Sequence, residues 1–402
     1  MSSKKFTNPF RPGAGHAPPY LAGRRKETVE FERLLKQEII LENMVLTGLR
    51  GTGKTVLLET LKPLAIKAGW RWVGTDLSES TSISEDRIAL RLITDLAVVT
   101  SSIEVQAREV AGIGFKPAQK KERSFLTFEL MTDMYKRTPG LVADKLKAVL
   151  ELVWACLQQQ QGARGLIFAY DEAQNLSDHA AEKEYPLSLL LDVFQSIQKK
   201  NIPLMLVLVG LPTLFPKLVE ARTFAERMFR VVFLDRLKEH DSRDAILKPI
   251  QDAKCPVKLD DGSVLLIIDH SGGYPYFIQF ICKEVYDLFL QKMDAGEKAS
   301  VPVEDITRKL DTNFFAGRWA RVTDRQRELL SVIAHLESCD SEFTVQEVVG
   351  ESKSRLEKSF SPSHVNQMLV TLATLGLVYK NRHGRYSFAV PLLGRFILRQ
   401  EQ

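Results

Sequence analysis

Eight residues near the N-terminus have the composition and spacing of a phosphate-binding loop. The stretch G-L-R-G-T-G-K-T at 48–55 places glycines where a backbone must turn with its N–H groups facing an anion. Lys54 would then reach the β- and γ-phosphates of a nucleotide, and the Thr55 hydroxyl would ligate Mg²⁺. A glycine-rich turn before a helix is the alternative. The nucleotide contacts expected from this stretch are Gly48, Leu49, Arg50, Gly51, Thr52, Gly53, Lys54, Thr55 and Val56.

A second stretch supplies the carboxylates that nucleotide hydrolysis needs. The apolar run 165–170 ends in Asp171 and Glu172, as a buried parallel strand ends at the carboxyl edge of a sheet. Asp171 would hold Mg²⁺ through water, and Glu172 would activate the attacking water as general base. A strand that merely ends in an acidic turn is the alternative. Together with Lys54, these carboxylates predict an ATPase that uses ATP and Mg²⁺.

Further positions could respond to the terminal phosphate. A strand over 203–210 is followed by Thr213, whose hydroxyl is either a phosphate sensor or the N-cap of the next helix. That helix, expected over about 213–229 and followed by a strand at 231–234, brings three arginines: Arg222, Arg227 and Arg230. Arg227 or one of its neighbours could act as an arginine finger in a neighbouring subunit's site. Solvated surface arginines are the alternative.

The surrounding pattern predicts an α/β fold. Apolar strand-like runs alternate with helical periodicity, which is typical of a parallel sheet. The expected strands are 44–47, 70–74, 165–170, 203–210 and 231–234, and the expected helices include 26–38, 53–67, 82–108, 141–160 and 184–199. Residues 1–20 are expected to lie as an arm over the core, and residues 238–312 to form an all-helical lid. A basic loop at 116–124 either faces DNA or is solvated.

The last ninety residues predict a winged helix-turn-helix. Helices are expected from Thr323, from about 343 and from Ser361, followed by two strands at 377–380 and 386–390 around a basic tip. From 353 onward eight basic residues face only Glu357 and Glu401 within the segment, a local excess that favours phosphate contact. A protein-docking module is the alternative. The third helix and the wing would contact duplex DNA through Ser363, His364, Asn366, Gln367, Lys380, Arg382 and Arg385.

Composition narrows the class of protein. A chain of 402 residues, 45% hydrophobic and 26% charged, predicts a globular protein of two or three domains. The sequence has no apolar secretion signal and no membrane-length apolar stretch, and its four scattered cysteines lack metal-ligand spacing. We therefore expect a cytoplasmic protein with reduced thiols and no membrane partner. The net charge of +5 permits nucleic-acid contact without arguing for it.

Taken in order, these motifs resemble those of the AAA+ and STAND P-loop ATPases, in the branch of replication-initiator-like and transposition-helper ATPases. The resemblance spans about residues 17–398. Residues 18–27 resemble the φ-x-G-R-x-x-E box that packs on adenine, and D-E-A-Q at 171–174 resembles a variant of the metal-binding strand end. Gly273-Tyr274-Pro275 is similar to the G-x-P lid motif of STAND proteins. The further nucleotide contacts that this resemblance implies are Tyr20, Leu21, Gly23, Arg24 and Pro275.

The resemblance also implies a domain order and a function. The expected domains are an arm with the adenine-side box (1–37), an AAA+-like core (38–237), a helical lid (238–312) and a winged helix (313–402). No lid arginine stands at the position of the second sensor, which favours slow turnover and a nucleotide-gated switch. The function expected is an ATPase switch on DNA for loading, assembly or remodelling, with an ATP-dependent homo-oligomer or a separate effector chain. The alternative is a STAND-type signalling or defence switch whose winged helix docks protein.

Overall fold

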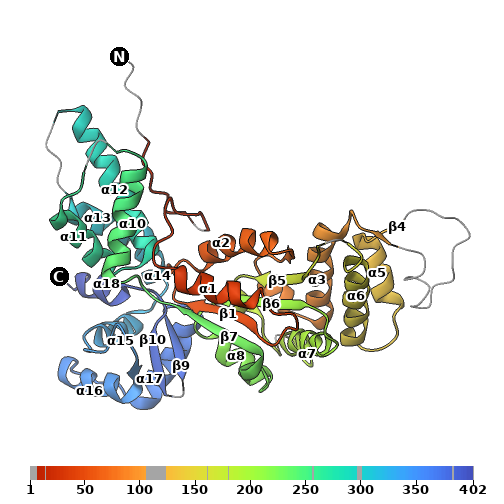
Figure 1. The fold of residues 1–402 in the computed structure, drawn as a ribbon. Coiled ribbons are helices and arrows are strands. Elements are labelled where there is room, and N and C mark those ends of the chain that lie inside the picture. The colour runs from red at the N-terminus through yellow and green to blue at the C-terminus, as the bar shows by residue number, and fades with distance from the viewer. Residues whose placement is uncertain are drawn as a thin grey trace, which may run out of the picture. The chain divides into compact units, whose positions relative to one another are not determined.

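The computed structural model describes residues 7–13, 15–105, 124–160, 162–179, 181–255, 258–296, 301–382 and 384–401. The basic loop expected at 116–124 therefore lies almost entirely outside the described residues. The chain forms two compact units (Figure 1), each with its own apolar core. Unit 1 comprises Met1–Gly23, Gly48–Val56 and Leu234–Gln402, and unit 2 comprises Arg24–Thr47 and Leu57–Phe233. The domain boundaries expected after residues 37, 237 and 312 stay predictions.

A five-stranded sheet forms the centre of unit 2, in the order β2-β5-β6-β1-β7. Its strands are β1 (Asn43–Gly48), β2 (Trp70–Val73), β5 (Gly165–Tyr170), β6 (Leu204–Gly210) and β7 (Phe229–Leu234). The pairs β1/β6, β5/β6 and β2/β5 are parallel, with Thr47 opposite Gly210 and Tyr170 opposite Leu208. Every residue of β1, β5 and β6 is buried, as continuous apolar strands of a covered parallel sheet should be. Figure 1 shows α2 on one side of these strands and α7 and α8 on the other.

The helices between the strands differ in detail from the sequence expectation. They are α1 (Arg25–Leu34), α2 (Lys54–Lys67), α3 (Glu85–Thr100), α5 (Phe128–Arg137), α6 (Val142–Leu157), α7 (Pro186–Lys199), α8 (Leu214–Ala221) and α9 (Ala225–Met228), with short turns η1 (Glu79–Ser82) and η2 (Ala173–Asn175). The helix expected to 108 ends at Thr100, and Glu104–Val105 (β3) pairs antiparallel with Ser124–Phe125 (β4). The helix expected over 213–229 was wrong as one element. Its chain becomes extended at Arg222, with φ −147° and ψ 117°.

Unit 1 is mainly helical. After β7 come α10 (Glu239–Asp252), α11 (Asp261–Ser271), α12 (Pro275–Asp294) and α13 (Val303–Leu310), then a π-helical turn η3 (Asp311–Phe315) and α14 (Ala316–Trp319). The tail holds α15 (Asp324–Ala334), β8 (Phe343–Thr344), α16 (Val345–Arg355), α17 (Pro362–Thr374), β9 (Val378–Arg382), β10 (Arg385–Phe388) and α18 (Leu393–Arg399). The three strands form an antiparallel sheet in the order β8-β10-β9. Neither β8 nor α18 was predicted from the sequence.

The helix starts in the tail follow from local capping chemistry. The Thr323 side chain accepts the backbone N–H of Gln326, and the Gln326 side chain accepts the backbone N–H of Thr323. Thr344 and Glu347 form the same reciprocal pair. Ser361 caps α17, whose first residue is a proline. These starts were readable in the sequence because each cap lies within four residues of its partner.

The N-terminal arm packs along α12. Asn8 Nδ2 donates to the Lys283 carbonyl at 2.9 Å and to Asp287 Oδ1 at 2.7 Å. Phe10 is 3% exposed, with its ring 6.3 Å from that of Tyr286. The arm is thus part of the apolar core of unit 1. Among the described residues, no helix is long and apolar enough to cross a membrane.

Candidate nucleotide site

The phosphate loop is closed by its own side chains. Lys54 Nζ donates to the carbonyl oxygens of Gly48 and Leu49, each at 2.9 Å, and Thr52 Oγ1 donates to Leu49 O at 2.8 Å. Gly51 and Gly53 have φ of 79° and 86°, which a glycine adopts without steric cost. A Cβ atom at Gly48 would lie 2.3 Å from the Leu234 carbonyl oxygen. The glycines are therefore required by the turn and by the close approach of the last residue of β7.

Within unit 1 the loop contacts the start of α12 and the tail. Tyr276 N donates to Gly51 O at 3.1 Å, so Pro275, the expected base contact, immediately precedes a residue bonded to the loop. A Cβ atom at Gly376, between α17 and β9, would lie 3.5 Å from Arg50 Nη1. The segments expected as lid and winged helix thus both reach the phosphate loop.

The adenine-side residues lie against α10. Lys248 Nζ donates to the Tyr20 hydroxyl at 2.7 Å and lies 4.3 Å from the centre of its ring. Hydrogen bonds to Asp244 and then to Tyr20 raise the pKa of Lys248 to about 12. A Cβ atom at Gly23 would lie 2.8 Å from Asp241 Cγ. Arg24, which belongs to unit 2, is buried, with Nη1 3.6 Å from Glu27 Oε1.

The two carboxylates stand at the carboxyl end of β5. Asp171 is 4% exposed and Glu172 is exposed. Glu172 N donates to Asp171 Oδ1 at 2.7 Å, and the Asp171 backbone bonds to the chain after β2 at Thr75 and Leu77. Glu172 has φ 52° and ψ 32°, the left-handed region that non-glycine residues rarely adopt. Such backbone strain concentrates at functional sites.

Strand β6 lies between the loop strand β1 and the carboxylate strand β5. It ends at Gly210, and Thr213 follows as the residue before α8. Thr213 occupies the N-cap position of α8, but its side chain makes no capping hydrogen bond within the part of the chain that is described. The sensor assignment stays a prediction.

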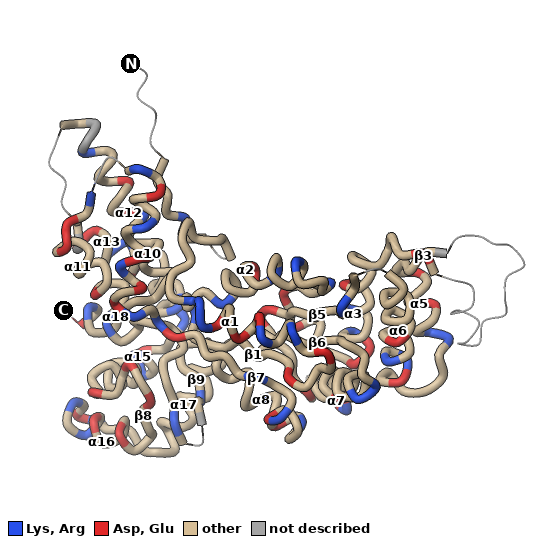
Figure 2. The backbone as a smooth tube through the Cα atoms, viewed as in Figure 1, with Lys and Arg blue, Asp and Glu red and all other residues tan. Residues whose placement is uncertain are grey.

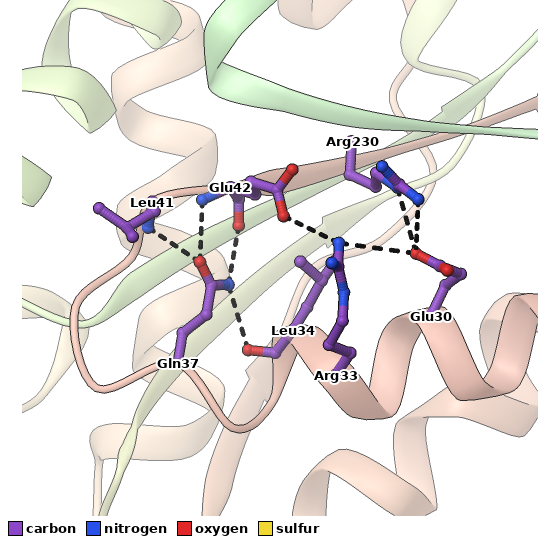
Figure 3. Close-up of polar contacts among 7 residues, drawn as sticks. All are labelled: Glu30, Arg33, Leu34, Gln37, Leu41, Glu42 and Arg230. Atoms are coloured by element: carbon purple, nitrogen blue, oxygen red, sulfur yellow. Dashed lines mark hydrogen bonds and ion pairs between the residues drawn. The ribbon is translucent and has the colours of Figure 1, made fainter.

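The three candidate finger arginines lie in different environments. Arg222 Nη2 and Nε donate to Asp192 at 2.6 and 2.8 Å. Arg230, on β7, bonds to Glu30 at 3.0 and 3.1 Å, beside a network of Arg33, Gln37 and Glu42 (Figure 3). Arg227 is exposed and makes no ion pair with any described residue. Among the three, Arg227 is therefore the candidate whose guanidinium is not held by a described carboxylate.

Gln174 is the residue that sequence reasoning quoted without assigning it a role. It lies in η2 and bonds to the Glu172 carboxylate through its amide nitrogen. Its amide oxygen accepts Leu211 N–H at 3.1 Å, and its backbone oxygen accepts Lys217 Nζ at 2.8 Å. Burial lowers the pKa of Lys217. The signal was present in the stretch 171–174, but the partners come from β6 and α8.

The expected DNA-contacting residues lie on α17 and on the hairpin of β9 and β10. Ser363, His364, Asn366 and Gln367 are exposed on α17, whereas Val365, Met368 and Leu369 between and beside them are buried. Lys380 is exposed on β9, and Arg385 pairs with Arg382 in the β9/β10 register. Neither Lys380 nor Arg385 forms an ion pair with a described residue.

The charge count of the tail needs correction. Three of its eight bases bond to acids that precede residue 353: Arg355 to Glu351, Arg395 to Asp269 and Arg399 to Asp311. Figure 2 shows acids and bases interspersed along α16. The excess inferred from the segment alone was too large, because the neutralising carboxylates lie elsewhere in the chain.

The residues present fit a magnesium nucleotide. The glycine loop of unit 1 holds a lysine ammonium and a threonine hydroxyl, and unit 2 holds two carboxylates after β5; these are the donor types that a magnesium nucleotide needs. Sheet, loop and strand order define an α/β P-loop ATPase fold of the AAA+ type, which confirms the predicted fold class for the core.

Solved structures share this fold. The Walker-type ATPase PABY2304 of Pyrococcus abyssi superposes with a TM-score of 0.58 at 14% identity, covering 94% of this chain and 96% of that one. The Aeropyrum pernix ORC2 protein in ADPNP–ADP complexes gives 0.54 at 15% identity, covering 97% and 98%. Its ADP form gives 0.52 at 15% identity, covering 97% and 96%. At these identities the likeness is one of fold.

The sequence comparisons are narrower. The family model of a domain of unknown function (DUF8462) matches residues 312–397, which hold η3 and most of the tail. No curated protein matches the sequence.

Proposed function

We propose that the protein binds and hydrolyses ATP as an AAA+/STAND-like switch that acts on duplex DNA. The observation that carries this proposal is the loop 48–55 between β1 and α2, with Asp171 and Glu172 ending β5 of the same parallel sheet. If the glycine-rich loop were only a turn before a helix, there would be no reason for another strand of the same sheet to be followed by two acids. The coincidence of both features in one sheet favours a nucleotide site.

Each residue has a defined role in this proposal. The Lys54 ammonium leaves its two carbonyl partners for the β- and γ-phosphates, to which it is more strongly attracted than to neutral oxygens. Thr55 and Asp171 would hold Mg²⁺, which would supply positive charge to neutralise the phosphates. Glu172 accepts the proton of the attacking water. Arg227 of a neighbouring subunit stabilises charge at the terminal phosphate.

The tail supports the DNA part of the proposal. The tail runs in the order α15, β8, α16, α17, β9 and β10, the order expected of a winged helix-turn-helix, and α17 presents polar side chains outward. His364, Asn366 and Gln367 include no guanine-reading arginine, so sequence discrimination should be modest.

A signalling switch is the second candidate. The Gly51–Tyr276 hydrogen bond to α12 and the approach of Arg50 to Gly376 of the tail favour a switch in which both segments sense the loop directly. In that case the exposed face of α17 would contact a protein, and duplex DNA would not bind.

Replacing Lys54 tests nucleotide binding. We expect Lys54→Ala to weaken ATP binding at least tenfold without unfolding the sheet, because the strands are held by apolar burial. Lys67→Ala, an exposed lysine at the end of the same helix, is the matched control. Equal ATP affinity in folded Lys54→Ala, measured by titration calorimetry, would refute the nucleotide site.

Replacing Glu172 separates binding from turnover. Glu172→Gln keeps size and polarity but cannot accept a proton, so bound ATP should persist while phosphate release falls by about a hundredfold or more. Glu59→Gln, an exposed glutamate on α2, controls for the loss of one charge. Wild-type turnover in Glu172→Gln would exclude Glu172 as the base.

A further inference from the structure

Gln174 connects the candidate base to the neighbouring strand. Its amide nitrogen bonds to Glu172 Oε2, and its amide oxygen accepts the N–H of Leu211, the first residue after β6. Its backbone oxygen accepts Lys217 Nζ from α8. One side chain thus joins η2, which follows the carboxylates, to the segment that contains Thr213.

The orientation of the Gln174 amide is fixed by chemistry. Leu211 N–H can only donate, so the group facing it must be the carbonyl oxygen of the amide. The NH₂ group then faces Glu172, where it donates to a carboxylate. No described residue bonds to the other oxygen of Glu172, which leaves that oxygen for a water molecule.

Gly210 makes room for this arrangement. A Cβ atom at position 210 would lie 2.6 Å from Gln174 Oε1 and 3.0 Å from Leu214 Cδ2. The last residue of β6 therefore has no side chain where the glutamine amide passes. The hydrogen bond between Gln174 and Leu211 therefore depends on the absence of a side chain at Gly210.

The backbone of Glu172 is fixed independently. Its N–H donates to Asp171 Oδ1 at 2.7 Å, and its φ of 52° is held at the end of β5. These contacts fix the backbone of Glu172 but do not fix the direction of its long, exposed side chain. The amide of Gln174 supplies that direction.

We propose that Gln174 is a positioning residue, which holds the Glu172 carboxylate for water activation and links it to the loop carrying Thr213. This inference rests on the proposed ATPase function. It predicts that removing the amide slows the chemical step and leaves nucleotide binding intact, because no contact of Gln174 involves the phosphate loop of unit 1 within the described chain.

Two variants of the full-length protein test the role. Gln174→Ala removes the donor to Glu172 and the acceptor of Leu211 N–H, so kcat for ATP should fall about tenfold with KM unchanged and the melting temperature lowered. Gln174→Glu keeps an oxygen for Leu211 N–H but places a carboxylate against Glu172, so kcat should fall further. Gln195→Ala, which removes a glutamine that bonds to Lys199 at the surface of α7, should leave kcat unchanged.

A double variant separates positioning from a structural role. If Gln174 acts through Glu172, then Glu172→Gln/Gln174→Ala should hydrolyse ATP no more slowly than Glu172→Gln in single turnover. Unchanged kcat in both Gln174 variants, or an equal further decrease in the Glu172→Gln background, would overturn the inference. Wild-type hydrolysis by Glu172→Gln would instead refute the proposed base itself, so the two failures are distinguishable.

Discussion

Glu172 combines a chemical role with a strained backbone. A non-glycine residue in the left-handed region costs about 1 kcal/mol, and the surrounding sheet must offset that cost. We therefore expect Glu172→Gly to abolish ATP hydrolysis while raising the free energy of unfolding by about 1 kcal/mol. Glu172→Gln should slow hydrolysis by about a hundredfold or more without that gain in stability. Urea unfolding of both variants checks the difference, and equal stabilities would show that the position carries no strain.

His270, at the end of α11, should give a pH-dependent contribution to stability. Burial lowers its pKa below the ordinary value of 6.5. At pH values between this lowered pKa and the ordinary value of 6.5, His270 binds more protons in the unfolded chain than in the folded chain. The free energy of unfolding therefore rises with pH through this range and is lost as the pH falls. We expect His270→Gln to flatten the decline of the unfolding free energy between pH 7 and 5. His240→Gln, at an exposed histidine, is the control, and parallel curves for all three proteins would contradict the prediction.

At the scale of elements, the helix break between α8 and α9 separates Arg222, which pairs with Asp192, from Arg227 in α9. Arg227 is therefore the candidate for an arginine finger. Hydrolysis per subunit should rise with protein concentration if Arg227 enters a neighbouring site, and Arg227→Ala should remove that rise while ATP still binds. Arg230→Ala should keep it, because its guanidinium already pairs with Glu30. A rate independent of concentration in the wild-type protein would exclude a finger supplied in trans.

The wing offers a test of DNA binding through salt dependence. Removing one cation that pairs with a DNA phosphate should reduce the slope of log affinity against log salt by about 0.9. Lys380→Ala and Arg385→Ala should each weaken duplex binding about equally for unrelated sequences and flatten this slope. Arg355→Ala, which removes a base already paired with Glu351, should change it less. Absence of duplex binding at low salt in the ATP-bound wild-type chain would favour the signalling switch.

Sequence reasoning succeeded where chemistry is local in the chain. The phosphate loop, the strand ending in Asp171 and the caps at Thr323 and Ser361 each lie within a few consecutive residues. The break at Arg222 was missed because its ion pair with Asp192 comes from another helix. The role of Gln174 and the neutralised arginines of the tail escaped for the same reason, since their partners are set by tertiary contacts.

At the scale of the whole molecule, the N-terminal arm should contribute to the stability of unit 1. Phe10 is buried against Tyr286, so Phe10→Ala should cost about 3 kcal/mol in unfolding free energy. Hydrogen exchange should quicken along α12 and remain unchanged in β5 and β6. Val98→Ala, at a side chain 80% exposed on α3, is the control. Equal stability of the wild-type and Phe10→Ala proteins would show that the arm is not part of the core.

The chain passes between the two units four times, and this has a consequence for biosynthesis. All of unit 2 (residues 24–47 and 57–233) has been translated once the ribosome passes Phe233. The loop segment 48–56 belongs to unit 1, most of which is translated only from Leu234 onward. At ribosomal speeds the loop leaves the tunnel on the order of ten seconds before Tyr276 and Gly376 exist to contact it. We therefore expect a nascent chain to bind nucleotide only after Tyr276 and Gly376 have been translated, so that a shorter polypeptide does not respond to ATP.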